Sequence, residues 1–324
     1  MNVSMANRVL ELLYDRVDGF FSLDELAAAA AMNRRRLDTV LQTLREGGHP
    51  LDSSPAHGVR LLRPAKLNSH LIERDLGTRR VGRCVICFEE VDSTNDVAMA
   101  SAGQSDTDGL VILAEFQRCG RGRLERQWIS PWGANVLLSA VLLEEDSERL
   151  SYGPLTIAAG LAVAEGIEAA CELHCQLKWP NDVLLDGAKV AGILVEIQTG
   201  AAGRRVVVGI GINTHASPPS GEVRTPATDL ASHLGRAVER TEVVRAVLRQ
   251  LDVWVHRVGD GRLAELHDAW LWRCGMINQR ITVQCASRRY VGRILDVSPL
   301  EGLVLCCDDG RRIHLPAEST TVVR

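Results

Sequence analysis

Residues 115–128 read EFQRCGRGRLERQW and follow an apolar run at residues 110–114 that suits a β-strand. Four arginines fall within nine residues of this stretch and are interleaved with Gly120 and Gly122. Glycine allows close backbone approach, and guanidinium groups bind phosphates and carboxylates through paired hydrogen bonds. The stretch therefore predicts a loop that binds an anion. A solvated basic loop is the alternative when the run is considered alone.

The composition is that of a globular protein with two or three domains. The chain has 324 residues, of which 46% are hydrophobic, and this is enough to bury sizeable cores. A formal net charge of −4 excludes a uniformly basic nucleic-acid-binding protein, so contact with DNA would need a local patch. The sequence has no 18-residue apolar run and no signal-peptide pattern, so we expect a cytoplasmic protein that does not bind membranes.

The nine cysteines favour reduced thiols over a disulfide framework, because their number is odd and their spacings are irregular. Cys84 and Cys87 form a CxxC pair, but a three-residue offset in an expected strand puts their thiols on opposite faces. Cys171 and Cys175 flank His174 without a second ligand pair to complete a tetrahedral site. The sequence therefore predicts no bound structural metal.

Residues 1–66 predict a compact helical unit that ends in a hairpin. Apolar residues recur with helical spacing near the N-terminus, Ser22 begins a capping box before a second helix, and Asn33 caps a third. Gly47-Gly48 ends the third helix, and two extended runs at residues 50–62 form a hairpin. Three helices followed by such a hairpin are typical of a winged helix-turn-helix domain.

Arg34, Arg35 and Arg36 occupy the first turn of the third helix, where the helix dipole disfavours cations. The N-terminal end of a recognition helix meets bases and phosphates in the major groove, so these arginines are candidate DNA-binding residues. The alternative is that Arg34 pairs with Asp38 and the other two are solvated. Residues 1–66 have a net charge of only 9 − 8 = +1, which weakens the argument for DNA binding.

From residue 67 to about 275, the chain alternates apolar runs that suit strands with helical stretches. Expected strands lie at residues 85–91, 110–114, 135–143 and 206–212, and expected helices at 94–102, 155–170 and 241–255. This pattern predicts an α+β domain built on a largely antiparallel sheet. Residues 215–229 are rich in Pro, Ser and Thr, which predicts a loop or lid, and short strands from residue 276 onward predict a small β-barrel.

Three further stretches carry unusual residues. Asp92-Ser93-Thr94-Asn95 follows a strand and by itself would be a helix N-cap. The Asp186-Gly187 turn joins two apolar strands and leaves Lys189 among them, where a lysine is costly to desolvate unless it meets an anion. Gly209 and Gly211 in VVVGIGIN leave room for a ligand or mark a bulge. The chain has no P-loop and no complete GxGxxG, so an anion is expected without a common nucleotide motif.

Together these motifs resemble the biotin protein ligases. DSTN, GRGR followed by a tryptophan and SPWGAN, KWPND with a lysine seven residues after the aspartate and AGILVE, and GIGIN occur in that family's order and spacing over about residues 85–215. The resemblance implies a class II synthetase-like mixed sheet at residues 67–275, a winged helix-turn-helix domain at 1–66 and an SH3-like β-barrel at 276–324. This layout is similar to the bifunctional ligases that also repress biotin operons.

The resemblance also implies the reaction. The family couples biotin to ATP with Mg²⁺ assistance, giving biotinyl-5′-AMP and pyrophosphate, and then transfers biotin to a lysine of a biotin carboxyl carrier protein. Lys189 and Arg121 would neutralise the biotin carboxylate and the α-phosphate as charge builds, and Arg123 would anchor the adenylate. The residues implied to bind biotin are Ser93, Thr94, Gln117, Gly120, Arg121, Lys189, Gly192, Leu194, Gly209 and Gly211, and those implied to bind ATP are Arg123, Trp128, Asn181 and Asn213. Further implied partners are operator DNA and a second copy of the chain.

Three alternatives remain open at this point. A lipoate or octanoyl transferase shares the catalytic fold, but its Arg-Arg-Gly-Gly-rich motif is absent. A regulator could bind biotin without ligating it, and a monofunctional ligase could carry a degenerate winged helix. The last alternative is favoured by the wing, SSPAHGVRL, which lacks the lysine and aromatic residue common in repressing members.

The chain departs from the GRGRxGRxW pattern of its relatives at two positions. Glu125 replaces a glycine, and Gln127 replaces a basic residue before Trp128. We expect the loop to be less basic and less mobile as a result, because glycine is the most flexible residue.

Overall fold

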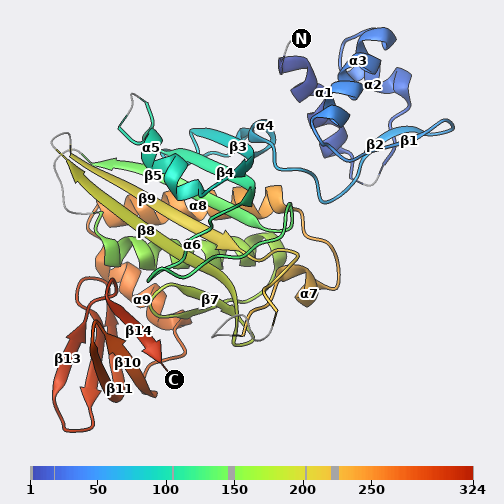
Figure 1. Cartoon of the computed structure of the whole chain (residues 1–324). Coiled ribbons are helices and arrows are strands. Elements are labelled where there is room, and N and C mark those ends of the chain that lie inside the picture. The colour runs from blue at the N-terminus through green and yellow to red at the C-terminus, as the bar shows by residue number, and fades with distance from the viewer. Residues whose placement is uncertain are drawn as a thin grey trace.

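The computed structural model describes residues 3–17, 19–103, 106–144, 150–200, 203–219 and 226–323. Figure 1 shows helices and a short hairpin at the N-terminus, a large central sheet with helices, and a smaller sheet at the C-terminus. The lid expected at residues 215–229 falls partly outside the described residues, which do not include 220–225.

The N-terminal unit contains three helices and a two-stranded hairpin, as the sequence predicts. The side chains of Ser22 and Asn33 each accept a hydrogen bond from an amide three residues later, at 3.2 and 2.9 Å, so both predicted N-caps are confirmed. A Cβ on Gly58 would lie 1.9 Å from the Phe21 carbonyl oxygen, so glycine is needed where the hairpin meets that residue. The elements are α1 (Val3–Asp15), α2 (Leu23–Ala29), α3 (Arg34–Glu46), β1 (Leu51–Ser54) and β2 (Gly58–Leu61).

A seven-stranded mixed sheet forms the centre of the molecule, in the order β3-β4-β5-β9-β8-β7-β6. Among the described strands, β3 and β4 pair in parallel and the other neighbours pair antiparallel, so the expected largely antiparallel sheet is confirmed. Helix α5 (Thr94–Ser101) lies in the connection that the parallel pair requires. The strands are β3 (Cys84–Val91), β4 (Leu110–Gln117), β5 (Val136–Glu144), β6 (Gln176–Lys178), β7 (Asp182–Leu185), β8 (Ala188–Gly200) and β9 (Gly203–Ile212).

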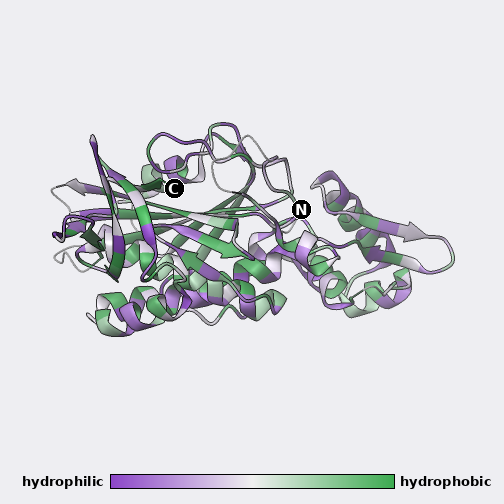
Figure 2. Ribbon diagram, turned by 90° about the horizontal axis from the view of Figure 1, so that it is seen from below, coloured by the Kyte–Doolittle hydropathy of each residue, from purple (hydrophilic) through white to green (hydrophobic). Residues whose placement is uncertain are grey.

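Helices form a layer along one side of this sheet (Figure 2). α6 (Tyr152–Cys171) packs against both β8 and α8 (Arg240–Gly259), and its small residues allow close contact: a Cβ on Gly166 would lie 2.7 Å from Val247 Cα. α6 is long and apolar enough to cross a membrane, but 78% of its apolar window is buried inside the protein. The shorter helices are α4 (Ser69–Glu73), α7 (Leu230–Leu234) and α9 (Leu263–Arg273).

The C-terminal unit is a five-stranded antiparallel sheet in the order β13-β12-β11-β10-β14. Its inward side chains, such as Val283, Ile294 and Leu305, belong to the same hydrophobic cluster as the buried residues of α6 and α8. The small sheet is therefore packed on the central unit through a shared core. Its strands are β10 (Arg280–Cys285), β11 (Arg288–Ser298), β12 (Gly302–Cys307), β13 (Arg312–Leu315) and β14 (Thr320–Val323).

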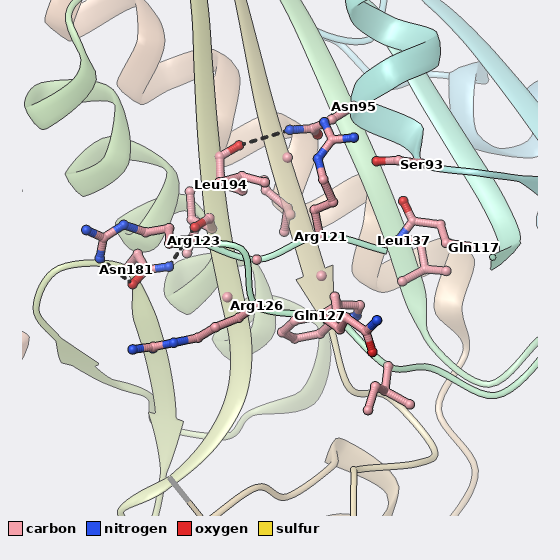
Figure 3. A pocket seen from close by; sticks show the side chains of 18 of the residues that line it. Ser93, Asn95, Gln117, Arg121, Arg123, Arg126, Gln127, Leu137, Asn181 and Leu194 are labelled. Atoms are coloured by element: carbon pink, nitrogen blue, oxygen red, sulfur yellow. Dashed lines mark hydrogen bonds between the residues drawn. The ribbon is translucent and has the colours of Figure 1, made fainter. Parts of the chain in front are cut away.

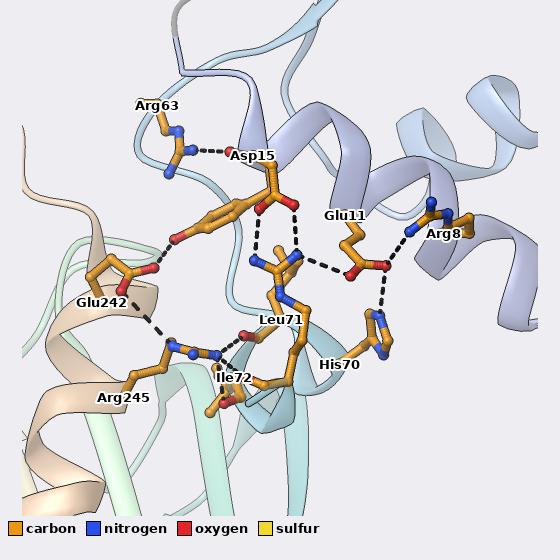
Figure 4. Close-up of polar contacts among 11 residues, drawn as sticks. Arg8, Glu11, Asp15, Arg63, His70, Leu71, Ile72, Glu242 and Arg245 are labelled. Carbon is orange, nitrogen blue, oxygen red and sulfur yellow. Dashed lines mark hydrogen bonds and ion pairs between the residues drawn. The ribbon is translucent and has the colours of Figure 1, made fainter. Parts of the chain in front are cut away.

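A polar cluster joins the N-terminal unit to the central unit (Figure 4). Tyr14 of α1 donates a hydrogen bond to Glu242 of α8 at 2.8 Å, and burial raises the pKa of this tyrosine well above its usual range. Arg63 donates to Glu239 at 3.0 Å, and its guanidinium lies 4.0 Å from the centre of the Tyr14 ring. Helix α4 contributes apolar side chains to both hydrophobic cores. The N-terminal unit is thus docked on the central unit by specific contacts.

Candidate active site

A pocket of about 440 Å³ opens between the loop at residues 121–129, the start of α5 and strands β8 and β9 (Figure 3). It lies at the point where the motifs quoted above converge, although they are far apart in the sequence. Of the predicted binding residues, those that line it are Ser93, Thr94, Gln117, Arg121, Arg123, Trp128, Asn181, Lys189, Gly192, Leu194, Gly209, Gly211 and Asn213.

Three strand glycines make room in the pocket. A Cβ on Gly209 would lie 2.3 Å from Asn95 Oδ1, and one on Gly211 would lie 2.4 Å from Trp128 Cε2. A Cβ on Gly192 would lie 2.9 Å from the Lys189 Nζ. Since Gly192 and Gly211 are cross-strand partners, the sheet presents a flat floor on which larger side chains rest.

Uncharged polar groups gather at the α5 end of the pocket. The Thr94 amide and hydroxyl both bind Gln117 Oε1, at 2.7 and 2.9 Å. Ser139 lies beneath them and donates to Asn95 Oδ1 at 2.6 Å. Ser93 is buried and forms no side-chain capping bond to α5, so its hydroxyl is available to the pocket. This end suits a neutral ligand with both donors and acceptors.

Lys189 lines the pocket from the start of β8, just after the β7–β8 turn, where the sequence places it. Its Nζ lies 2.5 Å from Asp182 Oδ1 and 5.5 Å from the centre of the Trp128 ring. The lysine is thus fixed by a carboxylate from the neighbouring strand while its charge still faces the cavity. Asp182 was not predicted as a site residue, although it is the aspartate of the quoted KWPND motif.

Arg121 is already paired with carboxylates in this structure. It donates to Asp96 of α5 at 2.6 Å and to Glu196 of β8 at 3.1 Å, and its hydrogen bond to Asp96 raises the pKa of the guanidinium. Asn95 donates to the same Glu196 at 2.7 Å, which connects this ion-pair cluster to the polar end of the pocket. Asp96, Glu196 and Asn95 were not predicted as site residues, because α5 and β8 are brought together only by the tertiary fold.

Arg123 is buried, with 8% of its surface exposed, and it reaches out of the loop towards the C-terminal sheet. It donates to the carbonyl oxygens of Ala317 and, at 3.1 Å, of Thr320, and to Asn181 Oδ1 at 3.3 Å. Asn181 in turn donates to the Ile193 carbonyl at 2.7 Å. Arg123 is therefore held between the central and C-terminal sheets.

Three buried polar atoms in the pocket wall lack a hydrogen-bond partner among the described residues. They are Arg123 Nε, Trp128 Nε1 and Asn213 Oδ1, and all three belong to residues predicted to bind ATP. A buried donor or acceptor without a partner costs about 1–3 kcal/mol. Two donors and one acceptor at this end of the pocket therefore indicate a place for a polar ligand.

Gly120 is the predicted residue that does not line the pocket within the described part of the chain. A Cβ on it would lie 2.4 Å from the Trp128 carbonyl oxygen, so it is needed for close packing within the loop. Gly120 and Gly122 do not have positive φ; Leu124 and Glu125 do, at 53° and 59°. The expected close backbone approach is therefore confirmed at Gly120, whereas the backbone strain from positive φ lies at Leu124 and Glu125, at the tip of the loop.

Pocket-lining residues that the sequence did not single out as site residues include Asn95, Arg126, Gln127 and Ile129. The signal for Asn95, Arg126 and Gln127 was their place inside the quoted motifs, and Ile129 lies between two of them. No group of three or more His, Cys, Asp or Glu side chains that could hold a metal occurs in the described parts of the chain. The nine cysteines are free thiols.

Comparison with known proteins places this pocket in a family. The model of the biotin/lipoate A/B protein ligase family matches residues 87–213, which span strands β3 to β9 apart from the start of β3. The bifunctional ligase/repressor BirA of Bacillus subtilis (strain 168) is 31% identical over 252 residues, which cover 76% of this chain and 77% of BirA. The chain belongs to the biotin protein ligase family.

Other members of this family are also similar in sequence to most of the chain. The biotin–[acetyl-CoA-carboxylase] ligase of Paracoccus denitrificans is 32% identical over 70% of this chain and 96% of its own length. BirA of Escherichia coli (strain K12) is 28% identical over 90% of this chain. Among solved structures, the biotin protein ligase of Aquifex aeolicus in complex with biotin and ATP superposes with a TM-score of 0.64 at 26% identity, covering 74% of this chain and 98% of that one.

Proposed function

We propose that the protein is a biotin–[biotin carboxyl carrier protein] ligase, which joins biotin to ATP as biotinyl-5′-AMP and then transfers biotin to a carrier lysine. One observation carries this proposal: a single pocket has a neutral polar end, a lysine and, at its other end, three buried polar atoms without partners. Family membership and the relatives named as ligases support it.

The α5 end fits the ureido ring of biotin. A cyclic urea presents two N–H donors and one carbonyl acceptor and carries no charge, which matches Ser93, Thr94 and Gln117. Asn95 and Leu194 line this end of the pocket, and the glycine floor leaves room for the ring system to lie against β9. The valerate chain would then run towards Lys189.

The Lys189 cation brings two anions together. The biotin carboxylate attacks the α-phosphate, and fixed positive charge beside both groups lowers the barrier because it needs no rearrangement during reaction. Lys189 is held for this by Asp182, and Arg121 fixes the loop by its bonds to Asp96 and Glu196. The adenylate end is formed by Arg123, Trp128, Asn181 and Asn213.

Mg²⁺ is expected to accompany the nucleotide. This ion binds few protein carboxylates and takes the remaining ligands from phosphate and water. Asp182 is a carboxylate on the pocket wall and would hold it together with the phosphates, so the residues present fit the ion. Its contribution is to neutralise the charge on the pyrophosphate that leaves.

The test is incubation of the protein with biotin, ATP and Mg²⁺, followed by mass analysis for biotinyl-AMP and by transfer of labelled biotin to a carrier domain. We expect both products. An adenylate formed from lipoate but not from biotin would identify a lipoate or octanoyl transferase instead. Biotin binding without any adenylate would identify a non-catalytic regulator.

We also propose that the N-terminal unit is a winged helix that binds DNA upstream of biotin genes, as the bifunctional names of the Bacillus and Escherichia relatives suggest. Arg34 is paired with Asp24 at 2.9 Å and lies 3.6 Å from Asp38, so it is the least suited of the three arginines to contact phosphate. Arg35 and Arg36 are exposed on the first turn of α3.

DNA binding is tested by titrating operator-region DNA at several salt concentrations, with and without biotin and ATP. Tighter binding with both ligands is expected. Each alanine substitution at Arg35 or Arg36 should reduce the salt slope by about 0.9 if it removes one phosphate contact. No binding at low salt would leave a monofunctional ligase.

The proposed ligase has three domains and forms a dimer. We propose domain boundaries after residues 66 and 275, a class II synthetase-like central domain, an SH3-like barrel formed by the C-terminal sheet, and a cytoplasmic homodimer that forms through the central sheet. Sedimentation of the protein with and without biotin and ATP tests dimerisation, and a monomer under both conditions would contradict it.

A further inference from the structure

The guanidinium of Arg123 is surrounded by backbone carbonyls of one short segment. Residues 316–320 connect β13 to β14, and the carbonyl oxygens of Ala317, Glu318 and Thr320 all accept from Arg123 Nη2, the last two at 3.4 and 3.1 Å. Tyr152, at the start of α6, lies beside the same guanidinium. The pocket loop of the central unit is thus hydrogen-bonded to the C-terminal sheet through Arg123.

These partners stabilise the guanidinium without cancelling its charge. Arg121 and Lys189 are each paired with carboxylates, but no carboxylate among the described residues forms an ion pair with Arg123. Carbonyl dipoles solvate a buried cation while leaving its net charge in place. Arg123 Nε, which has no partner among the described residues, keeps a donor for a ligand in the pocket.

We propose that residues 317–320 of the C-terminal sheet are a positioning element of the active site, which holds Arg123 at the nucleotide end of the pocket with its charge available to a phosphate. The proposal rests on the proposed ligase function. The C-terminal sheet acts only through Arg123, because its segment at 316–320 does not itself line the pocket among the described residues.

Arg123 and residues 316–320 stabilise each other's positions. A contact that holds Arg123 also holds residues 316–320, so loss of the arginine side chain frees the β13–β14 connection. A nucleotide that binds Arg123 stiffens the same connection, although it lies in a different sheet. Arg121 has no such effect, because its bonds run to α5 and β8.

Hydrogen–deuterium exchange of the full-length protein without ligands tests the anchor directly. In Arg123→Ala we expect amide exchange across residues 312–323 to rise at least about tenfold, since several hydrogen bonds to this segment are lost. Arg123→Lys should restore part of the protection, and the matched control Arg121→Ala should leave it unchanged. Unchanged exchange at residues 312–323 in Arg123→Ala would overturn the proposal.

A milder variant tests the functional consequence if Arg123→Ala does not fold. Tyr152→Phe removes the hydroxyl beside the guanidinium and should raise the KM for ATP by about tenfold with an unchanged KM for biotin. Tyr290→Phe, on β11, is the control and should change neither. Equal changes in both KM values would show a general structural role and overturn the proposal. Absence of biotinyl-AMP from the wild-type protein would instead contradict the ligase function, because the exchange experiment uses no substrate.

Discussion

Lys189 and Arg121 enter the pocket with carboxylates already beside them. Asp182 lies 2.5 Å from Lys189, and Asp96 and Glu196 lie 2.6 and 3.1 Å from Arg121. Such pairs fix long, flexible side chains before any ligand arrives, which reduces the reorganisation required during reaction. The positive charge of Lys189 is balanced by one carboxylate, whereas that of Arg121 is balanced by two. Lys189 is therefore the better placed of the two to neutralise substrate anions.

Replacement of Lys189 by alanine should reduce biotinyl-AMP formation by about 10²-fold or more, because a fixed charge at the reacting groups is lost. The fold should survive, since Asp182 can be solvated through the pocket. Pyrophosphate release and thermal unfolding measure the two effects. Arg311→Ala, at an exposed position of the C-terminal unit, is the control and should keep its activity. Unchanged pyrophosphate release in Lys189→Ala would remove the lysine from the mechanism.

The partly buried side chain of His49 should make the free energy of unfolding fall at low pH. Burial, aided by the neighbouring Lys66, lowers the pKa of His49 from 6.5 to about 4 in the folded protein. The unfolded chain binds the proton first as the pH falls below 6.5, so stability is present above that pH and is lost between about 6.5 and about 4. The loss approaches about 3 kcal/mol at the lower limit.

Urea unfolding near pH 7.5 and near pH 4.5 measures this loss. His49→Gln, which does not titrate, should lose less stability between the two pH values than the wild-type protein. His57→Gln, at an exposed position, is the control and should behave as the wild type. An identical acid response in all three proteins would show that His49 is not the cause.

At the scale of elements, β4 extends to Gln117, and the loop that follows it forms a small hairpin over residues 120–128 rather than an open glycine-rich loop. The Gly122 amide binds the Arg126 carbonyl oxygen at 2.7 Å, and a bridge pairs Arg121 with Gln127. The turn requires positive φ at Leu124 and Glu125, where residues with a Cβ are disfavoured by roughly 1–2 kcal/mol each. Trp128 then packs over Gly211 and secures the end of the hairpin.

The thermal stability of variants at Glu125 should therefore follow how well the new residue tolerates positive φ. Glu125→Gly relieves strain of about 1 kcal/mol but makes the unfolded chain more flexible, so thermal stability should rise slightly or stay equal. Glu125→Val should lower it, because a β-branched residue tolerates this conformation least. Glu125→Asn is the intermediate control. A valine variant as stable as the glycine variant would mean that the turn is not formed in solution.

At the scale of the whole molecule, the N-terminal unit is attached by more than its connecting chain. Arg63 binds Glu239 at 3.0 Å. Arg63 also binds the Tyr14 backbone, and Arg74 binds Asp15 at 2.7 Å across the same junction (Figure 4). Glu239 caps α8, whose next residue, Arg240, is buried against Glu115 at 2.6 Å. The orientation of the N-terminal unit is thus tied to the strand that leads into the pocket loop.

Loss of the Arg63 contacts should loosen this junction. In Arg63→Gln, we expect cleavage by thermolysin between residues 61 and 68 to become about tenfold faster, as hydrogen bonds worth about 1.4 kcal/mol are removed. Arg60→Gln provides the control, because Arg60 also stacks on an aromatic ring but pairs with Asp52 inside the hairpin. Equal cleavage rates in the two variants would show that the junction does not restrain the N-terminal unit.

The sequence by itself predicted the features that depend on neighbouring residues. The caps at Ser22 and Asn33, the Asp186-Gly187 turn before Lys189 and the strand glycines at 209 and 211 are local consequences of side-chain chemistry and backbone geometry. Motifs in a fixed order also indicated the family and most of the residues that line the pocket.

The tertiary structure alone decided which distant groups meet. Asp182 with Lys189, Glu196 with Arg121, and the carbonyls at 317–320 with Arg123 come from different strands or different sheets. The sequence could not predict these contacts, because a buried charge takes whichever partner the packing brings within hydrogen-bond distance. For the same reason, the basic stretch at residues 115–128 looked like one anion-binding loop, whereas the fold gives Arg118, Arg121 and Arg123 different partners.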